Sequence, residues 1–289
     1  MIADQALDER ALAKERALLD WLAARGSVLV GFSGGVDSTY LAACAVEALG
    51  PDRVLGVIGR SASLSRVQWT SAREAADHIG LPVLELDTEE LADPRYESNP
   101  GNRCYFCKTE LWTRLVPVAR ARGLAAVVDG TNASDGTDYR PGAAAAREHG
   151  VESPLADAGL TKDEIRSLSR ARKLPTWSQP SAPCLASRIP YGTAVTPERL
   201  RSVEQAEQAV RALGISGDLR VRHHGSVARV ELAPDELSQW LDATALARLT
   251  AAVRTAGFRR VALDARGFRS GSLNVLAGIG APAETGTGT

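Results

Sequence analysis

The chain has little net charge and no long apolar run. Its 34 lysines and arginines nearly balance 35 aspartates and glutamates, so the formal charge is −1 and the pI is near 6.5. Such a balance gives no general attraction to nucleic acid or to a membrane surface. No stretch approaches the length of a membrane span, and Met1–Leu19 is charged where a signal peptide would have an apolar core. We therefore expect a cytoplasmic protein that acts on a small molecule and binds neither membrane nor nucleic acid.

Cysteine is also scarce, with four in 289 residues. In a cytoplasmic protein, cysteines are more often reactive, metal-bound or buried than paired in disulfides. Cys44 follows Leu41 on an apolar stretch with helical character, which is typical of a small buried side chain. The positions of the other three cysteines therefore matter more than their number.

The first 178 residues alternate between apolar runs typical of strands and longer runs typical of helices. Strands separated by helices indicate a parallel sheet, so we predict one doubly wound α/β domain over residues 1–178. Ligands of such sheets bind at the carboxyl ends of the strands. The predicted helices are Asp4–Ala24, Ser38–Leu49, Ser65–Ile79 and Cys107–Arg122, and the predicted strands are Val28–Phe32, Val54–Ile58, Val83–Leu86 and Ala125–Asp129.

Beyond Pro175 the pattern changes, because proline and serine cluster at 178–183. We predict a cysteine-bearing linker at 179–196, a smaller α+β domain at 197–278 and a disordered tail at 279–289. A ferredoxin-like arrangement is one option for the α+β domain. Its predicted helices are Pro197–Leu213 and Asp235–Ala256, and its predicted strands are Leu219–His223, Ala228–Leu232 and Arg260–Leu263.

The most informative motif, S-G-G-V-D-S, lies between the first predicted strand and the helix that follows it. Glycines let a backbone approach an anion closely, first-turn N–H groups point at it, and two serine hydroxyls add donors. The motif has neither the lysine of a Walker A loop nor the G-x-G-x-x-G of a dinucleotide fingerprint. It resembles the PP-loop of ATP pyrophosphatases, which split ATP into AMP and pyrophosphate. The resemblance implies phosphate contacts at Ser33, Gly34, Gly35, Val36, Asp37 and Ser38.

Asp37 lies inside this predicted phosphate loop. A carboxylate there would repel phosphate unless a cation lay between the two groups. We therefore predict that Asp37 binds Mg²⁺ at the phosphate tail of ATP. An acidic residue at a helix N-terminus also stabilises the helix dipole, and the two roles are compatible.

Residues 130–135, after the fourth predicted strand, read G-T-N-A-S-D. They resemble the second nucleotide-side loop of the same superfamily, as in NAD synthetase. The resemblance implies ATP contacts at Gly130 and Thr131. Asp135 and Asp138 are candidates to reach the same Mg²⁺.

Thr161 and Glu164 have the spacing of a capping box at the start of a helix. A well-capped surface helix would explain that spacing by itself. The resemblance to the family segment adds Lys162 as a candidate phosphate partner.

A Cys-x-x-Cys motif at Cys104 and Cys107 is the second strong signal. It fits a redox pair, half of a zinc site or part of an iron–sulfur site. Cys184, on an irregular segment, is free to reach the pair. Three thiolates can hold a [4Fe–4S] cluster and leave its fourth iron open, and Arg103, Lys108 and Arg188 would favour thiolates electrostatically.

Four motifs together resemble the LarE sulfur transferases, over about residues 10 to 275. They are S-G-G-V-D-S at 33–38, N-R-C-Y-F-C-K at 102–108, D-Y-R-P-G at 138–142 and P-C-L-A-S-R-I-P-Y-G at 183–192. The resemblance implies a PP-loop, adenine nucleotide α-hydrolase-like fold and a role in making the nickel-pincer nucleotide cofactor. Such an enzyme adenylates a carboxylate of pyridinium-3,5-biscarboxylic acid mononucleotide and replaces an oxygen with sulfur.

The family has two forms. In one, a cysteine in the position of Cys184 gives up its own sulfur and becomes dehydroalanine. In the other, that cysteine and a Cys-x-x-Cys pair bind a [4Fe–4S] cluster that carries an extra sulfide. This chain has the three-cysteine pattern, so the resemblance implies the cluster form, with Cys104, Cys107 and Cys184 as ligands and Cys184 at the reaction centre.

The substrate's phosphate and second carboxylate call for cations. Period-two alternation places Arg220 and Arg222 on one face of a strand, and Glu231 on the next strand could orient one of them. The resemblance supports Arg222 and Glu231 near the substrate or a subunit interface, and Arg188 is a further predicted substrate contact. Exposed strand charges in an arginine-rich protein are the alternative.

Two other functions fit parts of this pattern. One is thiolation of a tRNA base, which also pairs PP-loops with three-cysteine clusters. The overall charge, and the absence of zinc-ribbon cysteines at either end, count against it. The other is a nucleotide-binding redox sensor without turnover. The resemblance also suggests a homo-oligomer, with a sulfur donor or cofactor-synthesis proteins as partners.

Overall fold

The computed structural model describes residues 8–137, 141–180 and 182–269. The described chain forms two compact units. The first contains the residues up to Glu90 together with Asn102–Ala182, and the second contains Leu91–Gly101 and the residues from Pro183 onward. The domain boundaries at 178, 196 and 278 stay predictions. Asp138 and the predicted tail lie outside the described residues.

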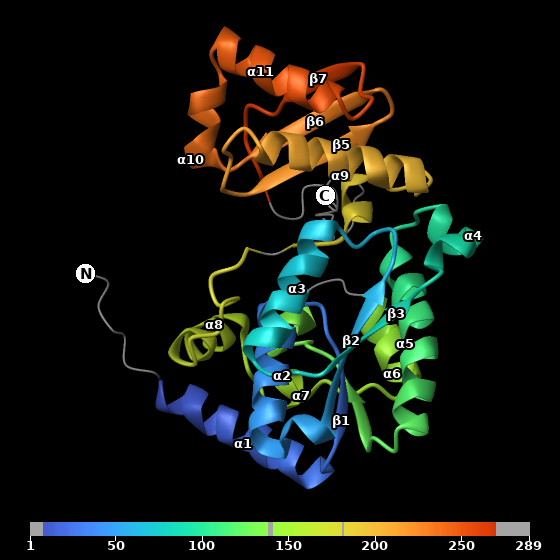
Figure 1. The fold of residues 1–289 in the computed structure, drawn as a ribbon, viewed down its shortest axis with the longest axis vertical. Coiled ribbons are helices and arrows are strands. Elements are labelled where there is room, and N and C mark those ends of the chain that lie inside the picture. The colour runs from blue at the N-terminus through green and yellow to red at the C-terminus, as the bar shows by residue number, and fades with distance from the viewer. Residues whose placement is uncertain (1–7, 138–140, 181, 270–289) are drawn as a thin grey trace, which may run out of the picture. The chain divides into compact units, whose positions relative to one another are not determined.

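The first unit is built on four parallel strands (Figure 1). They are β1 (Val28–Gly31), β2 (Val54–Arg60), β3 (Val83–Asp87) and β4 (Ala126–Val128), in the order β3-β2-β1-β4. The predicted parallel α/β sheet is confirmed.

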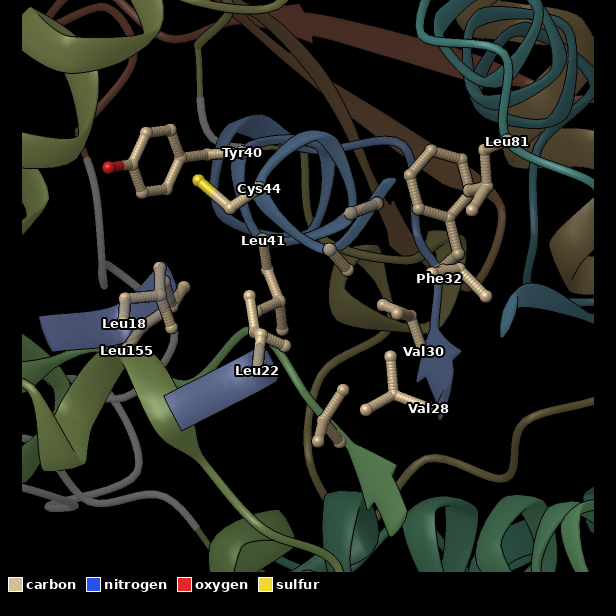
Figure 2. Packing of buried hydrophobic residues seen from close by; sticks show 14 of the residues in the cluster. Leu18, Leu22, Val28, Val30, Phe32, Tyr40, Leu41, Cys44, Leu81 and Leu155 are labelled. Carbon is tan, nitrogen blue, oxygen red and sulfur yellow. The ribbon is translucent and has the colours of Figure 1, made fainter. Parts of the chain in front are cut away.

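Helices cover both faces of this sheet. Successive side chains of a strand point to opposite sides, and in β1 the side chains on both sides are apolar and buried. Val28 and Val30 of β1 join the core with α1, α2, α3 and α8, and lie with Leu22 and Leu41 in Figure 2. Leu29 joins the opposite core, with α5 and α6. The helices of this unit are α1 (Glu9–Arg25), α2 (Val36–Leu49), α3 (Arg66–His78), α5 (Arg103–Ala121), α6 (Pro141–Glu148), α7 (Pro154–Asp157) and α8 (Lys162–Ala171).

Two helices begin earlier than predicted. Helix α2 starts at Val36, so Asp37 lies in its first turn, and α5 starts at Arg103, so Cys104 and Cys107 both lie on this helix, close to its N-terminus. Residues three apart share a face of a helix, which brings the two cysteines together. None of the described helices is both long and apolar enough to cross a membrane.

The second unit has a three-stranded sheet, in which β6 pairs antiparallel with β5 and parallel with β7. Its order of α9, β5, β6, α11 and β7 lacks, among the described residues, the first strand of a β-α-β-β-α-β ferredoxin-like unit. A separate core joins α9, the sheet and α11. The elements are α4 (Pro94–Glu97), α9 (Pro197–Arg211), β5 (Leu219–His224), β6 (Val227–Leu232), α10 (Pro234–Leu237), α11 (Ala243–Arg254) and β7 (Arg260–Leu263).

Candidate functional site

The S-G-G-V-D-S loop joins β1 to α2 at the carboxyl end of the strand. Gly34 has a φ of +69°, and a Cβ there would lie 2.3 Å from Cα of Ala72 on α3. A Cβ on Gly130, just after β4, would lie 3.0 Å from the backbone nitrogen of Ser38. The two loops predicted to bind ATP are therefore packed together, and glycine is what permits the approach.

The two serines of the loop hydrogen-bond each other and the backbone around them. Their hydroxyl oxygens are 3.0 Å apart, and the Ser38 hydroxyl donates to the Gly35 carbonyl at 3.3 Å. Gly35 caps α2 without a side-chain hydrogen bond. The N–H groups of the first turn, which begins at Val36, have no partners within the helix and suit an anion.

Asp37 and Lys162 form an ion pair beside this loop. Lys162 Nζ lies 2.5 Å from Asp37 Oδ2. The other carboxylate oxygen, Oδ1, is buried and has no hydrogen-bond partner among the described residues. A buried carboxylate oxygen without a hydrogen-bond partner suits a cation, so Asp37 Oδ1 fits the oxygen ligands that Mg²⁺ prefers.

Lys162 is positioned by the start of α8. The capping box predicted for Thr161 and Glu164 is present, and the backbone N–H of Lys162 donates to the Ser134 hydroxyl at 3.0 Å. Helix α8 is therefore tied to the second loop. The ammonium group of Lys162 lies beside the first loop through the contact with Asp37, and its predicted contact with phosphate stays a prediction.

The second loop is held from within by carboxylates. Asp129, at the end of β4, accepts hydrogen bonds from the backbone and hydroxyl of Thr131 and from the Ser153 hydroxyl, at 2.8 to 3.1 Å. Asp135 accepts from the backbone N–H of Asn132 at 3.1 Å. The predicted role of Asp135 in binding Mg²⁺ stays a prediction.

None of the four cysteines is paired in a disulfide. Cys44 is fully buried beside Tyr40 (Figure 2), as the sequence predicted, and burial raises the pKa of its thiol to about 12. Cys104 is exposed and Cys107 half-buried on α5 of the first unit, whereas Cys184 is half-buried in the second unit. No group of three metal-binding side chains occurs in the described ranges, so the three-cysteine site stays a prediction.

Cys184 directly precedes the short 3₁₀-helix Leu185–Arg188. Arg188 Nη1 donates back to the carbonyls of Pro183 at 2.6 Å and Cys184 at 3.2 Å. Its Nε and Nη2 donate to the two carboxylate oxygens of Glu207 on α9, at 2.9 and 3.1 Å. The charge of Arg188 is thus matched inside the unit, and its predicted contact with substrate stays a prediction.

Arg222 is oriented by Glu231, which is the kind of contact expected from the sequence. Its Nε and Nη2 both donate to Glu231 Oε2, at 3.0 and 2.9 Å, and its Nη1 donates to the Ser187 carbonyl at 2.9 Å. This guanidinium therefore joins β5 to the segment that follows Cys184.

Arg220 lies on the same strand, with its guanidinium 4.7 Å from the centre of the Phe268 ring. Burial, together with the neighbouring charge of Arg188, lowers the pKa of Arg220 to about 10. It stays protonated near neutral pH, and the crowding of arginines favours an anion nearby.

Sequence reasoning missed two residues of the second unit. Glu207 falls on the stripe of α9 that also carries the buried Leu200, Val203 and Val210. An acidic residue on the apolar side of a predicted helix indicates a buried polar contact, so Glu207 could have been found from the sequence. Asn99 is fully buried with a φ of +57°. The Asn-Pro step at 99–100 is typical of a turn, but it does not indicate which residues the Asn99 side chain contacts.

Comparison with known proteins matches residues 17–112 to the model of the NAD synthase family. An uncharacterised protein of Synechocystis is 43% identical over 246 residues, covering 85% of this chain and 91% of the relative. The pyridinium-3,5-bisthiocarboxylic acid mononucleotide synthase of Lactiplantibacillus plantarum is 35% identical over 247 residues, covering 86% and 88%. An NH3-dependent NAD⁺ synthetase of Methanosarcina mazei is 44% identical over only 61 residues, 21% of this chain and 24% of the relative.

These matches differ in how much of the chain they cover. The NAD synthase family model matches residues 17–112, which contain the phosphate loop, whereas the thiocarboxylate synthase matches 86% of the chain. The match to an ATP-using family explains the loop, and the longer match includes the region of Cys184. The chain is therefore a LarE-family enzyme, an ATP-using sulfur transferase.

Proposed function

We propose that the protein adenylates the carboxylates of pyridinium-3,5-biscarboxylic acid mononucleotide and converts them to thiocarboxylates, for synthesis of the nickel-pincer nucleotide cofactor. The observation that carries the proposal is the 35% identity to the thiocarboxylate synthase over 86% of this chain. The geometry of the phosphate loop supports the activating step, and the exposed or half-buried thiols of Cys104, Cys107 and Cys184 support a sulfur-transfer step.

The activating step uses the first unit. A carboxylate oxygen of the substrate attacks the α-phosphorus of ATP, the bond from that phosphorus to the bridging oxygen breaks, and pyrophosphate leaves with the electron pair. The N–H groups at the start of α2, the hydroxyls of Ser33 and Ser38, and Lys162 are the donors for the departing anion. Asp37 is the proposed ligand of Mg²⁺, which would neutralise charge on the pyrophosphate when bound.

The transfer step needs a sulfur nucleophile at the activated carbon. A new C–S bond forms, and AMP leaves with the electrons of the C–O bond. We assign Cys104, Cys107 and Cys184 as ligands of a [4Fe–4S] cluster, which would supply a sulfide on its open iron when bound. Cys104 is exposed, and Cys107 and Cys184 are half-buried, as an accessible ligand requires.

The substrate's anionic groups need cations in the second unit. Arg220 and Arg222 are the proposed contacts, with Glu231 holding the guanidinium of Arg222 in place. The low exposure of both arginines means that a bound phosphate would interact with them in a weakly screened environment.

A direct test supplies the full chain with ATP, Mg²⁺, a sulfide source and the pyridinium mononucleotide. We expect pyrophosphate release that depends on the mononucleotide, and a thiocarboxylate product by mass spectrometry. Transfer RNA in place of the mononucleotide should give no thiolated product. Pyrophosphate release that never depends on the mononucleotide would contradict the proposal.

The form of sulfur transfer needs its own test. Iron and sulfide content and the absorption spectrum of anaerobically reconstituted protein should report a [4Fe–4S] cluster, which the variant C107S should lose. A colourless, iron-free protein, with loss of hydrogen sulfide at Cys184 after turnover, would show the sacrificial route instead. Light scattering of the same samples would test the predicted homo-oligomer.

A further inference from the structure

The segment around Cys184 is held by several side chains of the second unit. We propose that Arg188 is a positioning residue, which fixes the main chain at Cys184 from an anchor on Glu207 and does not bind the substrate. The proposal rests on the proposed role of Cys184 in sulfur transfer. All the contacts that carry it lie within the second unit.

The first step of the argument is the direction of the Arg188 side chain. Its Nη1 has three oxygen acceptors, the carbonyls of Pro183 and Cys184 and the Ser187 hydroxyl, at 2.6 to 3.2 Å. The guanidinium thus folds back over the five residues before it. A side chain that binds its own segment in this way restricts the backbone torsions on either side of Cys184.

The second step is the anchor. Glu207 accepts from Nε and Nη2 of Arg188 through both oxygens, which is the bidentate geometry that fixes the plane of a guanidinium. Glu207 Oε1 also accepts from the backbone N–H of Val221 at 3.0 Å. Arg188 is therefore tied both to helix α9 and to strand β5, the rigid elements of this unit.

The third step is that the same segment is fastened at two further points. Arg222 donates to the Ser187 carbonyl. Asn99 Nδ2 donates to the carbonyls of Ile189, Pro190 and Thr193 at 2.8 to 3.3 Å. Residues 183–193 are thus held by side chains along most of their length. Sulfur transfer requires the sulfur to meet the activated carbon in one geometry, so such a hold has a direct use.

The rival role, a cation for the substrate, fits Arg188 less well. The Arg188 side chain is only 7% exposed and its charge is already matched by Glu207. A substrate anion would have to displace that carboxylate. Arg222 is also paired, but its partner Glu231 is shared with Arg229, which leaves positive charge there for an anion.

The test compares the full-length variants R188K and R211K with the parent protein. Lysine keeps the charge but cannot make the forked contact with Glu207. Arg211 is the matched control, because its Nη1 also donates to two carbonyls of the second unit, those of Ile215 and Gly217. Hydrogen exchange of peptides covering 184–189 measures the hold directly and needs no turnover.

We expect R188K to speed exchange in 184–189 by roughly tenfold or more, and R211K to leave that peptide unchanged. In kinetic assays, R188K should lower the rate of sulfur transfer by roughly tenfold, with substrate KM and pyrophosphate release within about twofold of the parent. E207Q, which keeps the shape of the anchor, should move exchange and transfer in the same direction, and serves if R188K fails to fold.

Unchanged exchange at 184–189 in both R188K and E207Q would overturn the proposal. So would a roughly tenfold rise in substrate KM with an unchanged transfer rate, which is the result for a substrate cation. If the parent protein transfers no sulfur, the proposed function fails, and the exchange data still decide whether Arg188 holds the segment.

Discussion

The phosphate loop and the Cys184 segment are both irregular stretches, but their hydrogen-bonding groups are used in opposite ways. In the loop, first-turn N–H groups have no side-chain cap, and a carboxylate oxygen of Asp37 is buried without a hydrogen-bond partner among the described residues. In the Cys184 segment, carbonyls are taken up by Arg188, Arg222 and Asn99.

The difference follows from what each stretch has to do. A binding loop must keep donors and charges for a ligand, so its backbone is shaped largely by glycine and close packing, and its first-turn N–H groups stay without a side-chain cap. A segment that presents a nucleophile must hold its backbone still, so its polar groups are satisfied internally. Variants of the two stretches should therefore affect the two chemical steps differently.

The largest expected effect separates the two chemical steps. C184S should abolish thiocarboxylate formation, because serine supplies no thiolate, and should leave substrate-dependent pyrophosphate release within about threefold. D37N should lower both by roughly 100-fold, because the activating step comes first. Single-turnover assays of pyrophosphate and thiocarboxylate measure the two steps. Loss of pyrophosphate release in C184S would contradict the assignment of the activating step to the phosphate loop and of the transfer step to the Cys184 segment.

The next effect tests the close packing of the loop. G34A places a methyl group 2.3 Å from Cα of Ala72, at a positive φ, and should destabilise the first unit by about 3 kcal/mol or more. Gly80 also has a positive φ, +65°, but a Cβ there meets nothing within 4 Å, so G80A should cost only about 1 kcal/mol. Urea unfolding measures both, and equal costs would show that backbone strain alone explains the glycine.

A smaller loss is expected where the Cys184 segment is fastened by Asn99. N99D replaces the amide N–H donors with a carboxylate oxygen that faces carbonyls, and should cost about 2–3 kcal/mol. N102D makes the same chemical change at an exposed position and should be nearly neutral. Hydrogen exchange at 189–193 should rise in N99D alone. If N99D left it unchanged, Asn99 would not be part of the hold.

The sequence predicted the sheet, because period-two alternation and apolar runs such as Val28–Phe32 depend on local pattern. The phosphate loop and the capping box at Thr161 were also readable, since each is encoded within about six residues. The contacts that hold the Cys184 segment could not be predicted, because they join distant parts of the sequence. Asn99 lies 90 residues before its partner Ile189, and Glu207 lies 19 residues after its partner Arg188. The inclusion of residues 91–101 in the second unit has the same cause, a long-range contact without a local signal.

The smallest expected effect is a pH dependence confined to the second unit, at His223 on β5. Its ring packs edge-on against Phe258, and Nδ1 is buried without a hydrogen-bond partner in the described chain. Burial and the nearby charge of Arg199 lower the pKa of His223, and burial and nearby arginines also lower the pKa of His224. The unfolded chain therefore takes up these protons first as the pH falls.

The stability that neutral His223 contributes is thus present above its ordinary pKa of about 6.5 and is lost as the pH falls below it. In the parent protein we expect the protection of residues 219–232 against exchange to fall as the pH is lowered from about 7.5 to 5.5. The fall should be smaller in H223F, which keeps an aromatic ring against Phe258. The difference between the two slopes should be less than the ~1.4 kcal/mol per pH unit of one full proton. Hydrogen exchange corrected for intrinsic rates measures it, and H78Q, at an exposed histidine of the first unit, is the control. The same pH slope in H223F and the parent would place the sensitivity at His224 or elsewhere, and a slope that H78Q also removed would show that the two units share it.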